Sequence, residues 1–205
     1  MRPRAVIFDL GGVVLDSPLH VIAAYERERG LPAGAINRVV ADTGPEGAWS
    51  RLERGELAMA AFQSAFDAEC AAAGLAVEAA ELMRRIGTCG PRPAMVQAIR
   101  RIRSRAVPVA ALTNNWSSEE DRTGELREEF DVFVESSVLG LRKPDPRIYT
   151  HTCEVLGVAP REAVFLDDIG RNLKAARELG MTTLKVDAPE PALDALSALL
   201  GFALR

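Results

Sequence analysis

The chain has 205 residues, 48% of them hydrophobic, and a formal net charge of -4 at pH 7. This length suits one main core carrying a smaller inserted module, and the negative charge without a basic stripe argues against a nucleic-acid partner. Asp9 interrupts the apolar N-terminal run before it could serve as a secretory or membrane-spanning segment, so we expect a cytoplasmic protein with no membrane partner.

The first predicted element is a strand at AVIF, residues 5–8, which ends at Asp9. Its apolar residues do not alternate with polar ones, which is typical of a strand buried on both faces of a parallel sheet. Gly11 and Gly12 follow closely. The sequence therefore places a carboxylate and a permissive backbone together at the carboxyl end of a buried strand.

Residues 17–89 come next and show helical periodicity with no convincing strand, punctuated by glycine and proline. We expect them to form a small all-helical insertion in an α/β core made of residues 1–16 and 90–205. GPRP, residues 90–93, is predicted to be the return connection.

After the insertion, predicted helices and strands alternate. The strands are VPVAAL, FDVFV, AVFL and TTLKV, at residues 107–112, 130–134, 163–166 and 182–186, and the helices cover residues 93–105, 117–128, 146–157 and 171–180. Asp145 before Pro146 is a typical helix start, and Gly157 and Gly180 stand where glycines end helices. This alternation predicts an α/β fold with a doubly wound, Rossmann-like parallel sheet.

Ligands of such sheets bind beyond the carboxyl ends of the strands, where three of the predicted strands carry polar side chains. Asp9 follows one strand, Thr113 and Asn114 follow another, and Asp167 and Asp168 follow a third. Singly, each is also an ordinary turn residue. Adjacent buried carboxylates, however, repel each other unless a cation is present, and magnesium prefers oxygen ligands. The sequence therefore predicts a Mg²⁺ site at this edge of the sheet.

A phosphoryl group is the ligand that fits this set of side chains. Asp9 would attack phosphorus in line, while the hydroxyl of Thr113 and the amide of Asn114 would donate to the phosphoryl oxygens. Gly11 and Gly12 would let backbone amides approach the anion. We therefore predict that the protein hydrolyses a small phosphorylated substrate. We expect it to be a monomer or a homodimer.

Four motifs together resemble those of the haloacid dehalogenase superfamily of hydrolases: FDLGGVV, LTNN, GLRKPDPRIY and FLDDIGRNLKAARELGM. More narrowly, TNNW, FDVFVESS, GLRKPDPRIY and FLDDIGRNL are similar to the phosphatase domain at the amino end of soluble epoxide hydrolases and its bacterial stand-alone relatives. The resemblance runs over nearly the whole chain. The chain has no room for the epoxide-opening domain, so the resemblance does not imply that activity.

The resemblance implies a role for each motif residue. Asp9 would be the nucleophile that forms an aspartyl-phosphate, and Lys143 would neutralise this intermediate. Asp168 would bind Mg²⁺ directly together with Asp9 and the carbonyl of Gly11, with Asp167 in a supporting role. Thr113 and Asn114 would hold the phosphoryl oxygens, and Asn172 would orient the cluster. The resemblance also implies that residues 17–89 form a helical cap over the site, with Trp49, Arg51 and Arg54 as candidates for substrate contact. Without the resemblance, Lys143 reads equally as a solvated loop lysine and Asn172 as a helix cap.

One position departs from the family pattern, which has an aspartate two residues after the nucleophile as general acid and base. Here that residue is Gly11. General acid–base catalysis typically contributes about 10²- to 10⁴-fold. We therefore expect a preference for substrates with good leaving groups, such as sugar 1-phosphates, acyl phosphates or aryl phosphates. Alternatively, Asp16 or a bound water would protonate the leaving oxygen in place of the missing aspartate.

Two other functions remain open from the sequence. One is a carbon–halogen hydrolase, in which the carboxylate attacks carbon without a metal, although the repulsion between Asp167 and Asp168 argues against it. The other is a catalytically inactive member of the family that binds a phosphorylated ligand or a protein, for which Gly11 is the best support.

Overall fold

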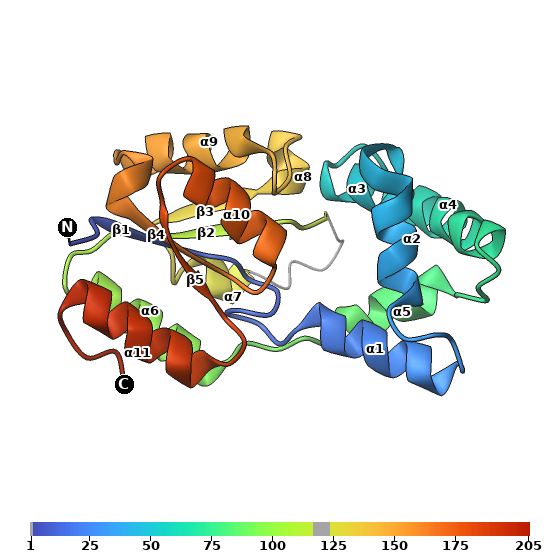
Figure 1. The fold of residues 1–205 in the computed structure, drawn as a ribbon, viewed down its shortest axis with the longest axis horizontal. Coiled ribbons are helices and arrows are strands. Elements are labelled where there is room, and N and C mark those ends of the chain that lie inside the picture. The colour runs from blue at the N-terminus through green and yellow to red at the C-terminus, as the bar shows by residue number, and fades with distance from the viewer. Residues whose placement is uncertain (1, 117–123) are drawn as a thin grey trace.

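The computed structural model describes residues 2–116 and 124–205 and contains one five-stranded parallel sheet (Figure 1). The strand order is β3-β2-β1-β4-β5. The strands are β1 (Ala5–Phe8), β2 (Val109–Thr113), β3 (Val132–Glu135), β4 (Ala163–Asp167) and β5 (Thr182–Lys185). All five predicted strands are confirmed, with ends that differ by at most two residues. Three of them, β2, β3 and β4, end one residue later than predicted, so Thr113 and Asp167 belong to strand ends rather than to the following loops.

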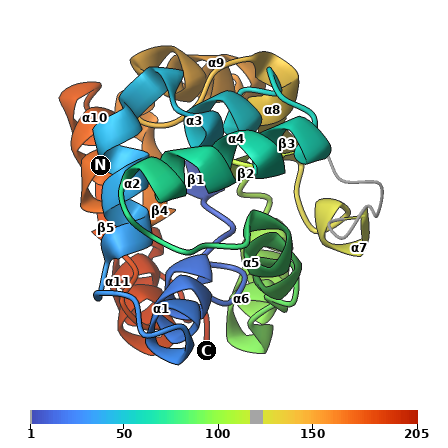
Figure 2. The same cartoon turned by 90° about the vertical axis from the view of Figure 1, so that its right-hand side faces the viewer.

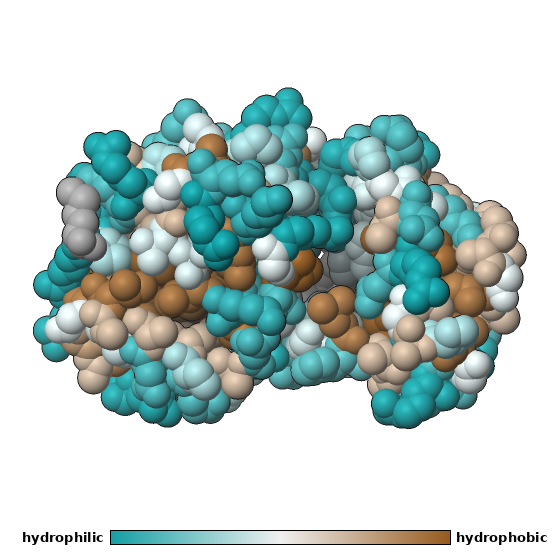
Figure 3. All heavy atoms as spheres, in the orientation of Figure 1, coloured by the Kyte–Doolittle hydropathy of each residue, from teal (hydrophilic) through white to brown (hydrophobic). Residues whose placement is uncertain are grey.

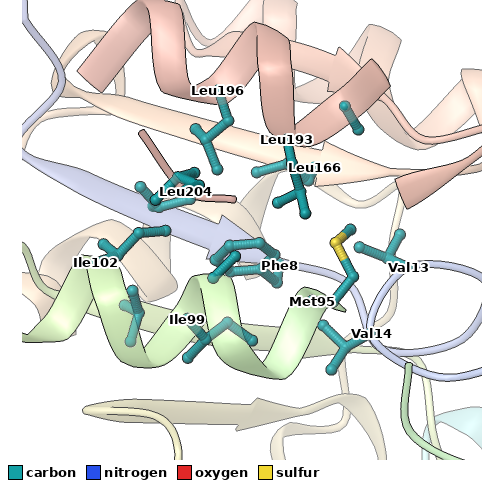
Figure 4. Packing of buried hydrophobic residues seen from close by; sticks show 14 of the residues in the cluster. Phe8, Val13, Val14, Met95, Ile99, Ile102, Leu166, Leu193, Leu196 and Leu204 are labelled. Carbon is teal, nitrogen blue, oxygen red and sulfur yellow. The ribbon is translucent and has the colours of Figure 1, made fainter. Parts of the chain in front are cut away.

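Helices cover both faces of the sheet, which explains why the strands are apolar without alternation. Val6 and Phe8 of β1 pack with α6 (Pro93–Arg103) and α11 (Pro189–Leu200), whereas Ile7 packs on the other face. That other face is covered by α9 (Pro146–Leu156) and α10 (Gly170–Glu178). Figure 4 shows Phe8 in the first of these layers, between Ile99 of α6 and Leu193 of α11. Successive side chains thus point to opposite buried faces.

The helix boundaries follow their capping residues. Asp145 caps α9, because its Oδ1 accepts from the amide of Arg147 at 2.9 Å, and Gly157 ends the helix in the left-handed region at φ 67°. These two predicted caps are confirmed, and Gly180, with φ 91°, directly follows the C-cap of α10 as predicted. Of the helix predicted at 117–128, residues 117–123 lie outside the described part of the chain, and α7 is Gly124–Arg127. The short elements are α8 (Ser136–Leu139) and the 3-10 turn η2 (Pro160–Glu162).

The segment between β1 and α6, which lies entirely within the described residues, has helices as its regular elements and no strand. Its elements are α1 (Pro18–Glu28), α2 (Ala35–Thr43), η1 (Gly44–Glu46), α3 (Ala48–Glu53), α4 (Met59–Ala72) and α5 (Ala79–Ile86), which we call the helical insertion. It has a hydrophobic core of its own, built around Tyr25, Ile36, Leu52, Phe62 and Phe66. Figure 2 looks onto the insertion and shows its helices in front of the sheet.

Two chain segments connect the insertion to the core, and they lie side by side. The amide of Asp16 donates to the carbonyl of Gly90 at 2.9 Å, and the amide of Arg92 donates to the carbonyl of Val14 at 2.8 Å. Figure 3 shows the surface hollowed between the α/β core and the helical insertion. The carboxyl ends of the strands face the insertion (Figure 1). Across the described residues, every helix is too short or too polar to cross a membrane.

Candidate active site

The carboxyl ends of β1 and β4 bring two predicted carboxylates together around one buried lysine. The register pairs Phe8 with Leu166, so Asp9 and Asp167 are neighbours across the two strands. Lys143 Nζ lies 2.7 Å from Asp9 Oδ1 and 2.8 Å from Asp167 Oδ2. Lys143 is 1% exposed and Asp167 is fully buried. The ammonium of Lys143 therefore bridges the two carboxylates away from water.

Burial and the neighbouring charges shift the pKa values of Asp9 and Lys143. Burial raises the pKa of Asp9 well above its usual value, the charges of Asp167 and Asp168 raise it further, and Lys143 opposes the change. Burial alone would lower the pKa of Lys143, but the two carboxylates together raise it. The lysine is thus held as a cation among three acids, and the site carries more negative charge than its one ammonium can balance.

These acids can accommodate a metal ion. Asp9, Asp167 and Asp168, which we call the acidic cluster, each offer an oxygen within 4.8 Å of the others. Asp168 Oδ1 is buried and has no hydrogen-bond partner among the described residues. Burial, and then the charge of Asp167, raise the pKa of Asp168 to about 6. A buried carboxylate oxygen without a donor beside other carboxylates is an arrangement that a hard cation satisfies.

Asp167 and Asp168 differ in their hydrogen bonds. Asp167 accepts from Lys143 Nζ, from the amide of Ile169 at 2.7 Å, and from Asn172 Nδ2 at 3.1 and 3.2 Å. Asn172 lies buried in the first turn of α10, as expected from the sequence. Because the chain itself satisfies Asp167, Asp168 is the acid of this pair with an oxygen left for a cation.

Gly12 makes room for Asp168. Its φ of +78° lies in the left-handed region, and a Cβ added there would stand 2.2 Å from Asp168 Oδ2. A side chain at this position would therefore displace the Asp168 carboxylate. The amide of Gly12 donates to the carbonyl of Asp16 at 3.3 Å, so it already has a partner within the chain.

The residues at the end of β2 lie beside the acidic cluster, but the side chain of Asn114 has a different partner from the one expected. Asn114 Oδ1 accepts from the amide of Lys143 at 2.8 Å, and Nδ2 donates to the carbonyl of Lys143 at 3.1 Å. The carboxamide thus binds both backbone polar groups of Lys143. Thr113 is buried at the strand end, and its hydroxyl donates to the carbonyl of Asn114 at a long 3.4 Å.

Gly11 is half-buried and packs beneath the first residue of α1. A Cβ at this position would meet Cγ and Cδ of Pro18 at 3.2 and 3.3 Å, which is close contact with a stiff ring. Asp16, the alternative acid considered from the sequence, has a largely exposed side chain 3.7 Å from Arg92 Nε.

Three polar residues that the sequence did not single out take part in this region. Arg92 Nη1 donates to the carbonyl of Gly12 at 2.9 Å. Arg142 Nε donates to Glu53 Oε2 of the helical insertion at 2.6 Å. In the sequence, Arg142 immediately precedes Lys143, and Glu53 stands between Arg51 and Arg54. This closeness to candidate site residues is the sequence signal that could have pointed to Arg142 and Glu53.

The three residues of the insertion considered for substrate contact have partners within the chain. Trp49 is buried and packs edge-on against Phe62 and Phe66 of α4. Arg54 Nε pairs with Glu56 at 2.5 Å, and Arg51 Nε lies 3.6 Å from the same carboxylate. Their contact with a substrate stays a prediction.

Comparison with known proteins agrees with the motifs. A family model for haloacid dehalogenase-like hydrolases matches residues 3–180. The chain is 42% identical over 207 residues to Acyl-CoA dehydrogenase family member 10 of Mus musculus, covering 98% of this chain and 19% of that protein. It is 31% identical over 221 residues to Bifunctional epoxide hydrolase 2 of Sus scrofa, covering 100% of this chain and 40% of that protein.

A solved structure has the same fold. A HAD family enzyme from Bacteroides thetaiotaomicron, in complex with magnesium and inorganic phosphate, has a TM-score of 0.66 at 19% identity, covering 92% of this chain and 96% of that chain. The chain spans less than half the length of the two curated relatives. Because the family model covers most of the chain and a relative above 30% identity covers all of it, the chain belongs to the haloacid dehalogenase-like hydrolases.

Proposed function

We propose that this hydrolase is a Mg²⁺-dependent phosphatase of a small phosphorylated metabolite, acting through an aspartyl-phosphate on Asp9. The observation that carries the proposal is the acidic cluster around Lys143, in which Asp168 keeps a buried oxygen without a donor. A carbon–halogen hydrolase has no need of three converging carboxylates, whereas a phosphatase that uses a cation does.

The cation would be held by Asp9, Asp168 and the carbonyl of Gly11, with Asp167 supporting them through Lys143 and Asn172. When bound, Mg²⁺ would neutralise the charge on the phosphoryl oxygens. The Bacteroides thetaiotaomicron enzyme of the same fold, which binds magnesium and inorganic phosphate, supports this assignment.

The hydrogen bonds of Asp9 indicate which of its oxygens attacks. The amide of Leu10 and Lys143 Nζ both bind Oδ1, each at 2.7 Å, which leaves Oδ2 as the oxygen that attacks phosphorus. A bond forms between Oδ2 and phosphorus as the bond to the leaving oxygen breaks. Lys143 would neutralise the phosphoryl charge and Thr113 would donate to an equatorial oxygen. Water then hydrolyses the aspartyl-phosphate, which releases phosphate and regenerates Asp9.

The leaving oxygen would receive no proton from residue 11, because glycine has no side chain to give one. Substrates whose leaving groups are stable as anions would therefore be favoured. Sugar 1-phosphates, acyl phosphates and aryl phosphates fit this requirement.

The deciding experiment measures hydrolysis of p-nitrophenyl phosphate with and without Mg²⁺. We expect turnover that requires Mg²⁺ and is lost in Asp9→Asn. Asp187→Asn is the matched control, because the exposed side chain of Asp187 pairs with Lys185 and is not part of the acidic cluster. Release of chloride from 2-chloropropionate in the presence of a chelator would instead indicate the dehalogenase, and binding of phosphate without turnover would indicate an inactive family member.

A further inference from the structure

The helical insertion contacts the core through a buried carboxylate. Glu53, the last residue of α3, is 7% exposed. Its Oε2 accepts from Arg142 Nε at 2.6 Å and from Asn114 Nδ2 at 3.2 Å, both in the core. Its Oε1 accepts from Trp49 Nε1 at 3.0 Å, within the insertion. One carboxylate thus links the insertion to two core loops that meet at the active site.

The next link leads from Asn114 to the catalytic lysine. The carboxamide of Asn114 binds the amide and the carbonyl of Lys143, and the ammonium of the same lysine bridges Asp9 and Asp167. If the carboxamide were flipped, its oxygen would face the carboxylate of Glu53 and the carbonyl of Lys143, and its NH₂ group would face the N–H of Lys143. All three contacts would be repulsive. Glu53 therefore helps to fix the orientation of the Asn114 carboxamide, which binds the backbone of Lys143.

The surrounding contacts make this junction tight. Arg142 Nη1 also donates to Ser50 Oγ at 2.9 Å, so the guanidinium both balances the charge of Glu53 and binds a second residue of α3. Gly55, with φ +71°, lies so close to α8 that an added Cβ would stand 2.2 Å from the carbonyl oxygen of Ser137. The insertion is thus seated against the core at the point where Glu53 reaches Asn114.

We propose that Glu53 is a positioning residue for the chemical step: it holds the Asn114 carboxamide, and through it holds Lys143 on the nucleophile Asp9. This inference rests on the proposed phosphatase function. It assigns to the helical insertion a part in building the catalytic geometry of the core, in addition to any contact with substrate. Because Glu53 acts through Asn114 and Lys143, its loss should impair the reaction of bound substrate more than the binding of substrate.

The kinetic test compares Glu53→Ala with the wild type on p-nitrophenyl phosphate with saturating Mg²⁺. We expect kcat to fall about 10- to 100-fold, as for small misplacements of catalytic groups, while KM changes less than about threefold. Glu53→Gln keeps an acceptor for Asn114 and Arg142, so its kcat should lie between those of Glu53→Ala and the wild type. Glu81→Gln is the control, because Glu81 is an ion-paired carboxylate of the insertion that bonds to Arg84 and Arg85 of its own helix.

A double variant tests whether Glu53 and Asn114 act in series. If they do, Glu53→Ala combined with Asn114→Ala should reduce kcat no further than the more damaging single change. Two independent contributions would instead multiply, and that result would overturn the proposal.

Tryptophan fluorescence gives a readout besides activity. The two tryptophans of the chain, Trp49 and Trp116, both lie at this junction, with ring centroids 6.3 Å apart. Glu53→Ala removes the hydrogen-bond partner of Trp49, so we expect a change in emission in a protein that still unfolds cooperatively, and none in Glu81→Gln. If Glu53→Ala fails to fold, Glu53→Gln decides the question, with a loss of about threefold or more in kcat expected from weakened hydrogen bonding.

The outcomes separate this inference from the proposed function. An active wild type whose Glu53→Ala variant is folded and keeps its kcat within about twofold overturns the positioning role and leaves the phosphatase assignment intact. A wild type without Mg²⁺-dependent turnover overturns both.

Discussion

The ammonium of Lys143 and the carboxylate of Asp9 lie 2.7 Å apart in a site where both side chains are almost completely buried. Removal of one partner leaves the other as an uncompensated buried charge, which is strongly destabilising. This relationship makes Lys143 important for the integrity of the site as well as for the proposed reaction.

Replacement of Lys143 by methionine should therefore lower both stability and activity. We expect the free energy of unfolding to fall by about 3–5 kcal/mol, as for other broken buried pairs. Phosphatase turnover should fall by about 10²-fold or more, because a preorganised charge at the phosphoryl group is lost. Denaturant unfolding and p-nitrophenyl phosphate hydrolysis measure the two effects. Lys174→Met is the control, since Lys174 is exposed and lies 3.9 Å from Glu178, and equal losses in both variants would contradict the prediction.

Gly12→Ala should abolish metal binding, because the added methyl would overlap Asp168 Oδ2. Calorimetric titration with Mg²⁺ measures this loss. Gly74→Ala is a matched control: Gly74 has a similar φ of +75°, but an added Cβ meets no atom within 4 Å. Both variants should lose about 1–2 kcal/mol of stability to left-handed backbone strain. Intact Mg²⁺ binding in Gly12→Ala would show that Asp168 does not need its present position.

The effect of Mg²⁺ on thermal stability should depend on pH through Asp168. Its pKa is raised from 3.8 to about 6, so the folded chain binds this proton more tightly than the unfolded chain. The contribution of this proton to the stability of the folded, metal-free chain is complete below about pH 4 and is lost as the pH rises through about 6. Mg²⁺ requires the ionised carboxylate, so the increase in Tm on adding Mg²⁺ should be larger at about pH 7.5 than at about pH 5.

Asp168→Asn provides the control for this pH dependence, because an amide does not titrate. The metal-free variant should lose less stability than the wild type between about pH 4 and about pH 7. An equal increase in Tm at both pH values in the wild type would count against a role of Asp168 in metal binding.

Gly11→Asp should restore a general acid and raise turnover on alkyl phosphates, by at most about 10²- to 10⁴-fold. The contact of the new Cβ with the ring of Pro18 limits this gain, so adding Pro18→Ala should increase it. Gly11→Asn is the control of matched size without an acid. Unchanged rates in both Gly11→Asp proteins would show that another group already protonates the leaving oxygen.

A series of aryl phosphates tests the same point in the wild-type chain. Without an acid at residue 11, the logarithm of kcat/KM should fall steeply as the pKa of the leaving phenol rises. The slope should become shallower in Gly11→Asp. A shallow slope in the wild type would indicate that proton donation is already efficient, with Asp16 the first side chain to examine.

The sequence predicted the sheet because its three central strands are buried on both faces, and this burial leaves a local signature in runs such as AVIF and AVFL. It also predicted that Asp9, Thr113 and Asp167 would meet, since parallel strands place their carboxyl ends at one edge. The structure brings these residues together, and the supporting position of Asn172 next to Asp167 agrees with the expectation. Their catalytic roles remain predictions.

The contacts made by Glu53 and Asn114 could not be predicted in this way. Glu53 and Arg142 are separated by 89 positions in the chain, and nothing in the periodicity of either segment indicates that α3 docks beside the loop preceding α9. Likewise, a Thr-Asn-Asn sequence after a strand gives no sign that one amide binds the backbone of a distant lysine. Such contacts depend on how two separately packed bodies meet, which local patterns do not encode.

The paired segments at Val14–Asp16 and Gly90–Arg92 have a consequence for how this architecture diversifies. Because the outgoing and returning segments are bonded to each other, the α/β body closes on itself whatever is spliced between them. Modules of different length or shape can be exchanged at this junction without altering strand pairing. The part of the chain that contacts new molecules can then change while the sheet that carries the acidic cluster stays the same. If Glu53 holds Asn114 as proposed, each new module would also have to supply a carboxylate that reaches Asn114.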